Sequence, residues 1–142
     1  MTAALAEARA AVLRDEVPVG AVVVRNGEVI AAAGNRTREL GDATAHAEML
    51  AIRLASERLR QERLTGCDLW VTLEPCAMCA GAIAHARLDR LYYAADDPKG
   101  GAVAHGPRLF GQATVHHRPE IYSGIGETEA AALLTEFFAR KR

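Results

Sequence analysis

The segment LWVTLEPCAMC, residues 69–79, decides how this chain folds. Residues 69–73 form a continuous apolar run rich in strand-forming side chains, which predicts a buried strand. Pro75 suits the first turn of a helix, so a helix is expected to open there and to continue to about Arg87. Because another apolar run follows at residues 88–95, the pattern predicts an α/β fold.

Outside this segment the chain continues to alternate between strand and helix patterns. Asn26-Gly27 is a strong hairpin turn, because both positions tolerate positive φ, and it predicts an antiparallel strand pair. Residues 96–126 are long for a loop, so we expect them to be functional or to contain short elements. The remaining expected elements are strands at residues 17–24 and 28–33 and helices at 3–14, 45–59 and 128–140, the last packing through Ala131, Leu134, Phe137 and Phe138.

Length and charge limit the class of protein. A chain of 142 residues corresponds to one domain, expected to span residues 1–142. The formal net charge of -1 argues against a protein that coats nucleic acid in general. No apolar run approaches a membrane span, and the first residues carry acid where a signal peptide needs base, so we expect a cytoplasmic protein.

The cysteines indicate a metal site. Cys76 and Cys79 are three residues apart on the expected helix, so both thiolates can bind one zinc ion, with His46 as a third ligand. Cys67 and His85 are both too far along the chain to act as the fourth ligand. The fourth position is therefore expected to be open to water, which distinguishes catalytic zinc from structural zinc.

Glu48 follows His46 by two residues, at the start of an expected helix. If the metal lies over the helix end, this longer side chain can reach the attacking water without binding the metal, which suits a proton shuttle. A lone Cys-x-x-Cys pair is weak evidence, because it is compatible with structural zinc first and then with redox chemistry or chance. The accompanying His-x-Glu pair favours catalytic zinc.

Other residues of interest have simpler interpretations. His105, His116 and His117 are interpreted as ordinary surface or loop histidines, with a phosphate contact by the last two and Arg118 as an alternative. Trp70 lies within an apolar strand and is expected in the core.

The motif residues resemble a known superfamily. His46-Ala47-Glu48, together with residues 72–83 (TLEPCAMCAGAI), is similar to the cytidine and nucleobase deaminase superfamily. Further stretches resemble the bacterial deaminases that convert the wobble adenosine of tRNA to inosine, namely residues 16–21 (EVPVGA), 35–36 (NR), 44–48 (TAHAE) and 97–102 (DPKGGA).

This resemblance implies a cytidine-deaminase-like three-layer α-β-α sandwich with a central mixed five-stranded sheet. It implies one Zn²⁺ per subunit, bound by His46, Cys76 and Cys79, with Glu48 as the proton shuttle. It also implies a homodimer whose partner is a tRNA anticodon stem-loop. The substrate-binding positions that it implies are Val17, Asn35, Ala47, Glu74, Asp97 and Lys99.

Two other functions share some of these features. A deaminase of free guanine, cytosine or cytidine would keep every metal residue and differ only around the pocket. A non-catalytic, zinc-stabilised RNA-binding module would need four protein ligands and would have no use for Glu48.

Overall fold

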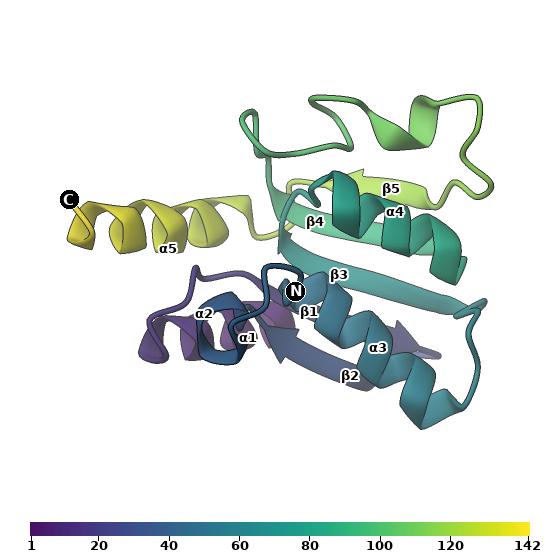
Figure 1. Cartoon of the computed structure of the whole chain (residues 1–142), viewed down its shortest axis with the longest axis horizontal. Helices are drawn as coiled ribbons and strands as arrows, with labels where there is room; N and C mark the ends of the chain where they lie inside the picture. The colour runs from purple at the N-terminus through teal and green to yellow at the C-terminus, as the bar shows by residue number, and fades with distance from the viewer.

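Five strands form one mixed sheet in the computed structural model, which describes residues 1–142 (Figure 1). The strands are β1 (Gly20–Arg25), β2 (Glu28–Gly34), β3 (Cys67–Leu73), β4 (Arg90–Ala95) and β5 (Glu120–Ser123). Their order is β2-β1-β3-β4-β5. β1 pairs antiparallel with both β2 and β3, whereas β3, β4 and β5 run parallel. The expected mixed five-stranded sheet is confirmed.

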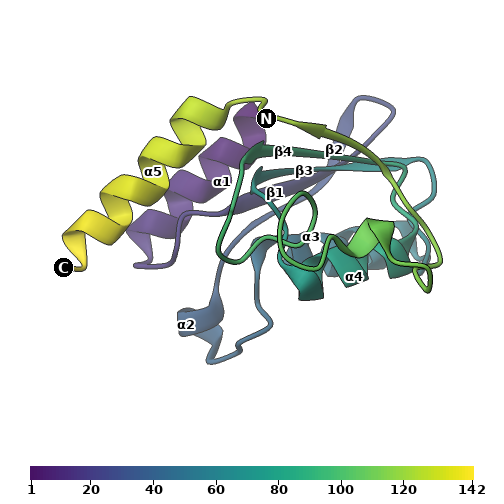
Figure 2. The same ribbon diagram turned by 90° about the horizontal axis from the view of Figure 1, so that it is seen from above.

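Helices cover both faces of this sheet. They are α1 (Thr2–Leu13), α2 (Thr37–Leu40), α3 (Ala47–Leu59), α4 (Ala77–Ala86) and α5 (Glu127–Arg140). Figure 2 shows α1 and α5 on one face and α3 and α4 on the other, which confirms the three-layer arrangement. None of these helices combines the length and the apolar character that crossing a membrane requires.

The hairpin between β1 and β2 follows the sequence prediction. Asn26 and Gly27 have φ angles of 52° and 77°, as the predicted turn requires. The first strand begins at Gly20 rather than at Val17, because Pro18 has no N–H for a sheet and Val19 N–H bonds the carbonyl of Val17 in a tight turn.

Buried Glu16 explains the short helix α2, which is not among the elements expected from the sequence. Its carboxylate accepts hydrogen bonds from the backbone N–H groups of Arg38, at 3.1 Å, and Glu39, at 2.8 Å. These are first-turn N–H groups that have no partner inside a helix. A residue more than twenty positions earlier in the chain therefore stabilises this turn.

The C-terminal third of the chain differs in detail from the expectation. Residues 96–126 do contain short elements, β5 and a 3₁₀ turn at Leu109–Gly111. The expected packing face of α5 is partly wrong: Ala130 and Phe137 are buried, whereas Ala131 and Phe138 are exposed. The helix contacts β4 and α1 along a narrow stripe, which leaves Phe138 outside the contact.

Small residues let the layers approach closely. Gly20 lies directly under α1, where an added Cβ would be 1.9 Å from the carbonyl oxygen of Ala4. The main core lies between the sheet and the α3/α4 layer and includes Ala47, Ala51 and Cys67. Close approach is thus local to these small residues, and larger side chains such as Leu69, Ile83 and Tyr93 fill the rest of the same core.

Trp70 is not in that core, contrary to expectation. It is only partly buried and stacks on Tyr92, with ring centroids 3.8 Å apart, and Tyr92 stacks in turn on Tyr122. The three residues are register partners on β3, β4 and β5, so parallel pairing places their rings in a row.

Candidate active site

Two helix N-termini meet at one edge of the sheet and bring the motif residues together. His46 immediately precedes α3, and Cys76 immediately precedes α4, which follows β3. Neither side chain caps its own helix, so both are free to face each other. The partial positive charge of the two helix ends favours thiolate and other anionic groups here.

The distances between the three predicted metal ligands fit a zinc ion. Nδ1 of His46 lies 3.6 Å from Sγ of Cys76 and 3.5 Å from Sγ of Cys79. Zinc bonds of about 2.3 Å to sulfur and 2.05 Å to nitrogen, at a tetrahedral angle, require a separation of about 3.6 Å. Cys67 and His85 are not part of this group, as expected.

The electrostatics of this group favour the metal-binding form of Cys76 and oppose that of His46 and Cys79, because the pKa of Cys76 is lowered and the pKa values of the other two are raised. The hydrogen bond from the Cys79 thiol, with further help from His46, lowers the pKa of Cys76 to about 4. The same contact with Cys76 raises the pKa of His46. One sulfur is therefore a thiolate at neutral pH, which is the form that binds metal.

Glu48 lies in the first turn of α3 and is only 4% exposed. Burial raises the pKa of its carboxyl group above the ordinary value. A carboxyl group with a raised pKa, beside a metal site, is suited to accept a proton and give it up again.

A cavity of about 340 Å³ opens over these residues. This volume falls within the range of small-molecule sites, about 300–1,000 Å³. The lining residues are Val17, Val19, Asn35, Thr37, His46, Glu48, Leu73, Glu74, Cys76, Asp97 and Gly100. Of the six substrate-binding positions predicted from the sequence, four line it, whereas Ala47 and Lys99 do not. Val19, Thr37 and Leu73 also line the cavity but were not predicted, because neither their residue types nor the motifs around them indicate a binding role.

The side chain of Asn35, which lines the cavity, has one hydrogen-bonding group without a partner in the chain. Its Oδ1 accepts a hydrogen bond of 2.8 Å from the backbone N–H of Ala47, at the start of α3. Ala47 itself is fully buried, and it contacts Asn35 through its backbone N–H. The Nδ2 group of Asn35 makes no hydrogen bond within the chain and remains as a donor.

Glu74 is placed differently from the other cavity residues, because its side chain is completely buried. Burial by itself raises the pKa of this carboxyl group. Hydrogen bonds from the backbone N–H of Asp97 and from His105 outweigh that effect, so the pKa lies below its ordinary value. His105, expected to be an ordinary loop residue, is the side-chain partner of Glu74.

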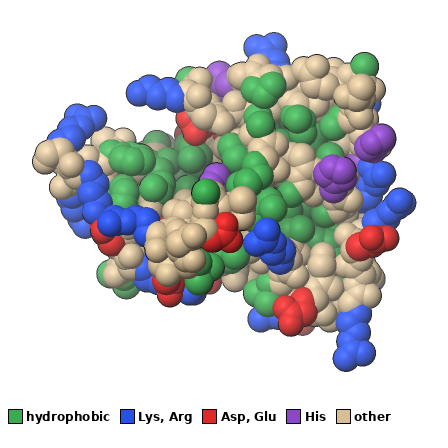
Figure 3. All heavy atoms as spheres, in the orientation of Figure 1, with side chains coloured by type: hydrophobic (Ala, Val, Ile, Leu, Met, Phe, Trp, Pro, Cys, Tyr) green, Lys and Arg blue, Asp and Glu red, His purple; other side chains and the backbone are tan.

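A wider groove of about 760 Å³ continues from the cavity and shares with it Val17, Leu73, Asp97 and Gly100. The other groove residues are Lys99 and four residues of the C-terminal segment, Leu134, Phe138, Lys141 and Arg142. Figure 3 shows hydrophobic side chains gathered in the hollow beside α5, with Lys and Arg side chains at the outer end of the helix. The groove thus combines an apolar floor with basic groups.

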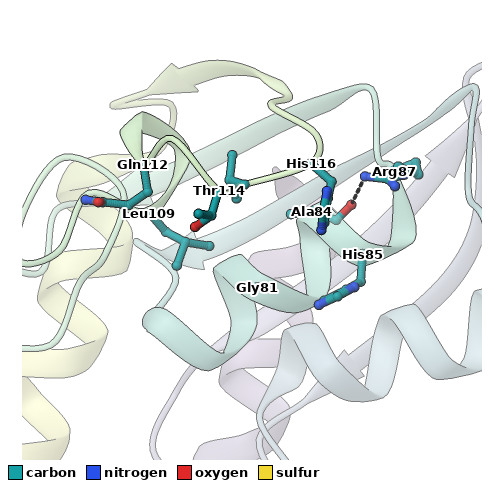
Figure 4. Close-up of a pocket in the computed structure, with 9 residues that line it drawn as sticks. Gly81, Ala84, His85, Arg87, Leu109, Gln112, Thr114 and His116 are labelled. Atoms are coloured by element: carbon teal, nitrogen blue, oxygen red, sulfur yellow. Dashed lines mark hydrogen bonds between the residues drawn. The ribbon is translucent and has the colours of Figure 1, made fainter.

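A separate hollow of about 300 Å³ lies on the other side of α4 (Figure 4). His85 from α4 and His116 from the loop before β5 both line it, together with Leu109 and Gln112. It shares no residue with the metal-ligand group or the cavity above it. It is therefore distinct from the candidate active site.

The alternative phosphate contact by His116, His117 and Arg118 is not favoured, because two of these three residues bond within the chain. Nε2 of His117 is 2.6 Å from the carbonyl oxygen of Leu88, and Arg118 donates to the carbonyl groups of Phe110 and Gln112. Both side chains are occupied in holding the loop before β5 to the sheet.

A His-Cys-Cys ligand group beside a buried glutamate, in a three-layer α-β-α fold, defines the class of zinc-type hydrolytic deaminases. The sequence profile of the MafB19-like deaminases matches residues 1–142. The chain therefore belongs to the MafB19-like deaminase family.

Within this family the similarity to tRNA-specific deaminases is strong. The chain is 63% identical to the tRNA-specific adenosine deaminase of Agrobacterium fabrum (strain C58 / ATCC 33970), over 100% of this chain and 93% of that protein. The corresponding protein of Bacillus subtilis (strain 168) is 43% identical, over 100% of this chain and 88% of that protein. A solved structure from a study of A-to-I editing by tRNA:A34 deaminases aligns with a TM-score of 0.93 and 63% identity, over 94% of this chain and 97% of that one.

Free-base deaminases share the fold at lower similarity. The guanine deaminase from Nitrosomonas europaea aligns with a TM-score of 0.78 and 28% identity, over 96% of this chain and 81% of that one.

Proposed function

We propose that this protein is a zinc-dependent deaminase that converts the wobble adenosine of a tRNA anticodon loop to inosine and releases ammonia. The observation that carries this proposal is the His46-Cys76-Cys79 group with Glu48 at the floor of a cavity of base size. Three ligands leave a tetrahedral metal with one open position, which is typical of catalysis. When bound, zinc would supply Lewis acidity that makes water a nucleophile near neutral pH.

Glu48 carries the proton transfers in this proposal. Its carboxylate accepts a proton from the water that attacks C6 of adenine, and returns a proton to N1 of the ring. The proton that remains on the oxygen added at C6 is then transferred by Glu48 to the exocyclic nitrogen, the C6–N bond breaks, and ammonia leaves while inosine remains. Burial of Glu48 keeps bulk water away from these transfers and raises its pKa, so that the group can act in both directions.

Asn35 and Val17 orient the base. The free Nδ2 of Asn35 would donate to an acceptor nitrogen or oxygen of the substrate, while its Oδ1 remains bonded to α3. Val17 and Leu73 line the same cavity and offer apolar surface to the flat faces of a purine.

The groove beside the cavity favours an RNA loop over a free base. Its apolar floor includes Phe138, which can stack on an unpaired base, and Lys99 and Arg142 can pair with phosphates. Lys141 lies in the same groove, but its ammonium group is paired with Asp15. A free base needs neither feature. Since tRNA is the proposed substrate, we place the activity in the cytoplasm.

The test is product detection by mass spectrometry with zinc-loaded protein. An anticodon stem-loop carrying a wobble adenosine is compared with free adenosine, guanine, cytosine and cytidine. Inosine in the stem-loop alone is expected. Turnover of only a free base or nucleoside would keep the chemistry but reject the tRNA substrate, and no turnover on any of them would favour a non-catalytic binding module.

The proposal includes a homodimer, which the family resemblance implies. Sedimentation equilibrium measures it directly: twice the chain mass of 15.2 kDa is expected, and a single chain mass at assay concentration would reject it.

A further inference from the structure

The loop that follows β4 wraps around the carboxylate of Glu74. Oε1 accepts hydrogen bonds from the backbone N–H of Asp97, at 3.0 Å, and from Nδ1 of His105, at 2.8 Å. Oε2 accepts hydrogen bonds from the backbone N–H groups of Val103, Ala104 and His105, at 3.1, 3.0 and 3.2 Å. One buried carboxylate thus receives hydrogen bonds from both ends of the segment 97–105.

This arrangement is not a cation site, although Glu74, Asp96 and His105 lie within 4.8 Å of one another. Both oxygens of Glu74 already accept hydrogen bonds from N–H groups, whose positive ends would repel a cation. The site is built for the carboxylate itself, in the way that backbone N–H groups form a nest around an anion.

The loop is shaped around Glu74 at close range. An added Cβ on Gly101 would lie 2.4 Å from Oε2 of Glu74 and 2.6 Å from the carbonyl oxygen of Asp97, so no side chain fits there. The Asp97 carboxylate accepts hydrogen bonds from the N–H groups of Lys99 and Gly100, at 3.2 and 3.0 Å, which closes the first turn of the loop. The segment from Asp97 to Gly101 is therefore placed as one unit.

That unit forms a wall of the active-site cavity. Asp97 and Gly100 line the cavity, and Lys99 lines the groove that continues from it. At its other end the loop bonds to the chain beside a metal ligand, because the N–H of Ala102 donates to the carbonyl of Pro75 at 2.9 Å. Figure 2 shows the chain after β4 turning along the edge where α3 and α4 begin.

We propose that Glu74 is a positioning residue, and His105 its partner, which together hold the loop 97–105 against the substrate cavity and thereby set the affinity for the RNA. Glu74 does not contact the substrate in this role, because its carboxylate is fully buried and its oxygens are occupied. The role depends on bonds between Glu74, which immediately follows β3, and a loop more than twenty residues later, and not on the metal group.

The test compares variants that remove or keep individual hydrogen bonds. Glu74→Gln keeps the size of the side chain but turns one oxygen into an NH₂ group that faces N–H donors. His105→Ala removes only the Nδ1 bond, whereas His105→Asn keeps a donor at the same distance from the backbone as Nδ1. Glu62→Gln is the matched control, since Glu62 is exposed and makes no hydrogen bond or ion pair within the chain.

Each variant is measured for zinc content, for kcat and KM on the stem-loop, and for hydrogen exchange of peptides that cover residues 97–105. Glu74→Gln is expected to raise KM about tenfold, with kcat changed less than about threefold, because the loop contributes to binding and not to the reacting atoms. Exchange in residues 97–105 should accelerate. His105→Ala should show a smaller change in the same direction, and His105→Asn and Glu62→Gln should behave as the wild type.

A fall in kcat at unchanged KM would overturn the proposal, because it would indicate a smaller folded fraction and not a displaced loop. Unchanged exchange in residues 97–105 of Glu74→Gln would overturn it as well. If that variant does not fold, the two His105 variants decide, and a His105→Ala protein with wild-type KM and exchange refutes the role. The kinetic arm rests on the proposed function, whereas the exchange arm tests the loop even if the stem-loop is not a substrate.

Discussion

Replacing Asn35 by Asp should separate the structural role of this residue from the substrate-binding role proposed for it. The Oδ1 of Asn35 accepts a hydrogen bond from the N–H of Ala47, and its Nδ2 is the free donor in the cavity. Asp is nearly the same size and keeps the acceptor. It replaces the donor with a second acceptor, so only the contact to the base should be lost.

The size of the effect follows from these contacts. Loss of a hydrogen bond to a buried base, together with an acceptor facing another acceptor, costs about 2–3 kcal/mol, which lowers kcat/KM about 30- to 150-fold. The free energy of unfolding should stay the same or rise by about 0.3–1 kcal/mol, because a carboxylate at the N-terminus of α3 is favourable. Asn35→Ala also loses the hydrogen bond that Oδ1 accepts from the N–H of Ala47 at the start of α3, and it should destabilise the protein by about 1 kcal/mol.

The assay measures kcat/KM on the anticodon stem-loop and unfolding in urea, with zinc content determined for each variant. Wild-type kcat/KM in Asn35→Asp would refute the assignment of Nδ2 as a substrate donor. A loss of stability in Asn35→Asp equal to that in Asn35→Ala would refute the separation of the two roles.

Three further changes test other parts of the structure. Glu48→Gln should keep its zinc, measured by atomic absorption, while kcat falls by about 10³-fold, because the proton acceptor is gone; activity near that of the wild type would contradict the mechanism. Cys76→Ser should lose most of its zinc and melt at a lower temperature in calorimetry, since a hydroxyl group is a poor zinc ligand; full zinc occupancy would exclude Cys76 as a ligand. Gly20→Ala should destabilise the protein by about 2–3 kcal/mol in urea unfolding, because its Cβ collides with the carbonyl of Ala4, and an unchanged midpoint would show that α1 can shift at little cost.

Local sequence patterns determined most of the secondary structure. The Asn26-Gly27 turn, the strand before Pro75 and the helix after it are confirmed, because each depends on preferences within a few residues. The helix α2 and the packing face of α5 were not predictable in this way. The first depends on buried Glu16, far away in the chain, and the second depends on how the helix lies against β4 and α1.

The sequence also predicted which of the site residues lie together. His46, Cys76 and Cys79 stand immediately before or within the first turn of two helices, so the fold class alone brings them to one edge of the sheet. The spacing within each helix start is short: His46 and Glu48 are two residues apart, and Cys76 and Cys79 are three apart. Side chains so close along a helix can reach one metal site. Glu48, placed by the same helix start, shares the cavity with them.

The tertiary structure alone decided what surrounds that group. The bond from Ala47 to Asn35, the groove beside α5 and the closure of the loop 97–105 on Glu74 all join segments that are distant in sequence. Nothing in the neighbourhood of His105 indicates that it bonds a carboxylate 31 residues earlier. By itself the sequence therefore predicted the candidate ligands, because these follow from local spacing, and the reaction class, because the motif resembles that of a known superfamily. The walls of the cavity follow from long-range packing, which appears only when the chain is folded.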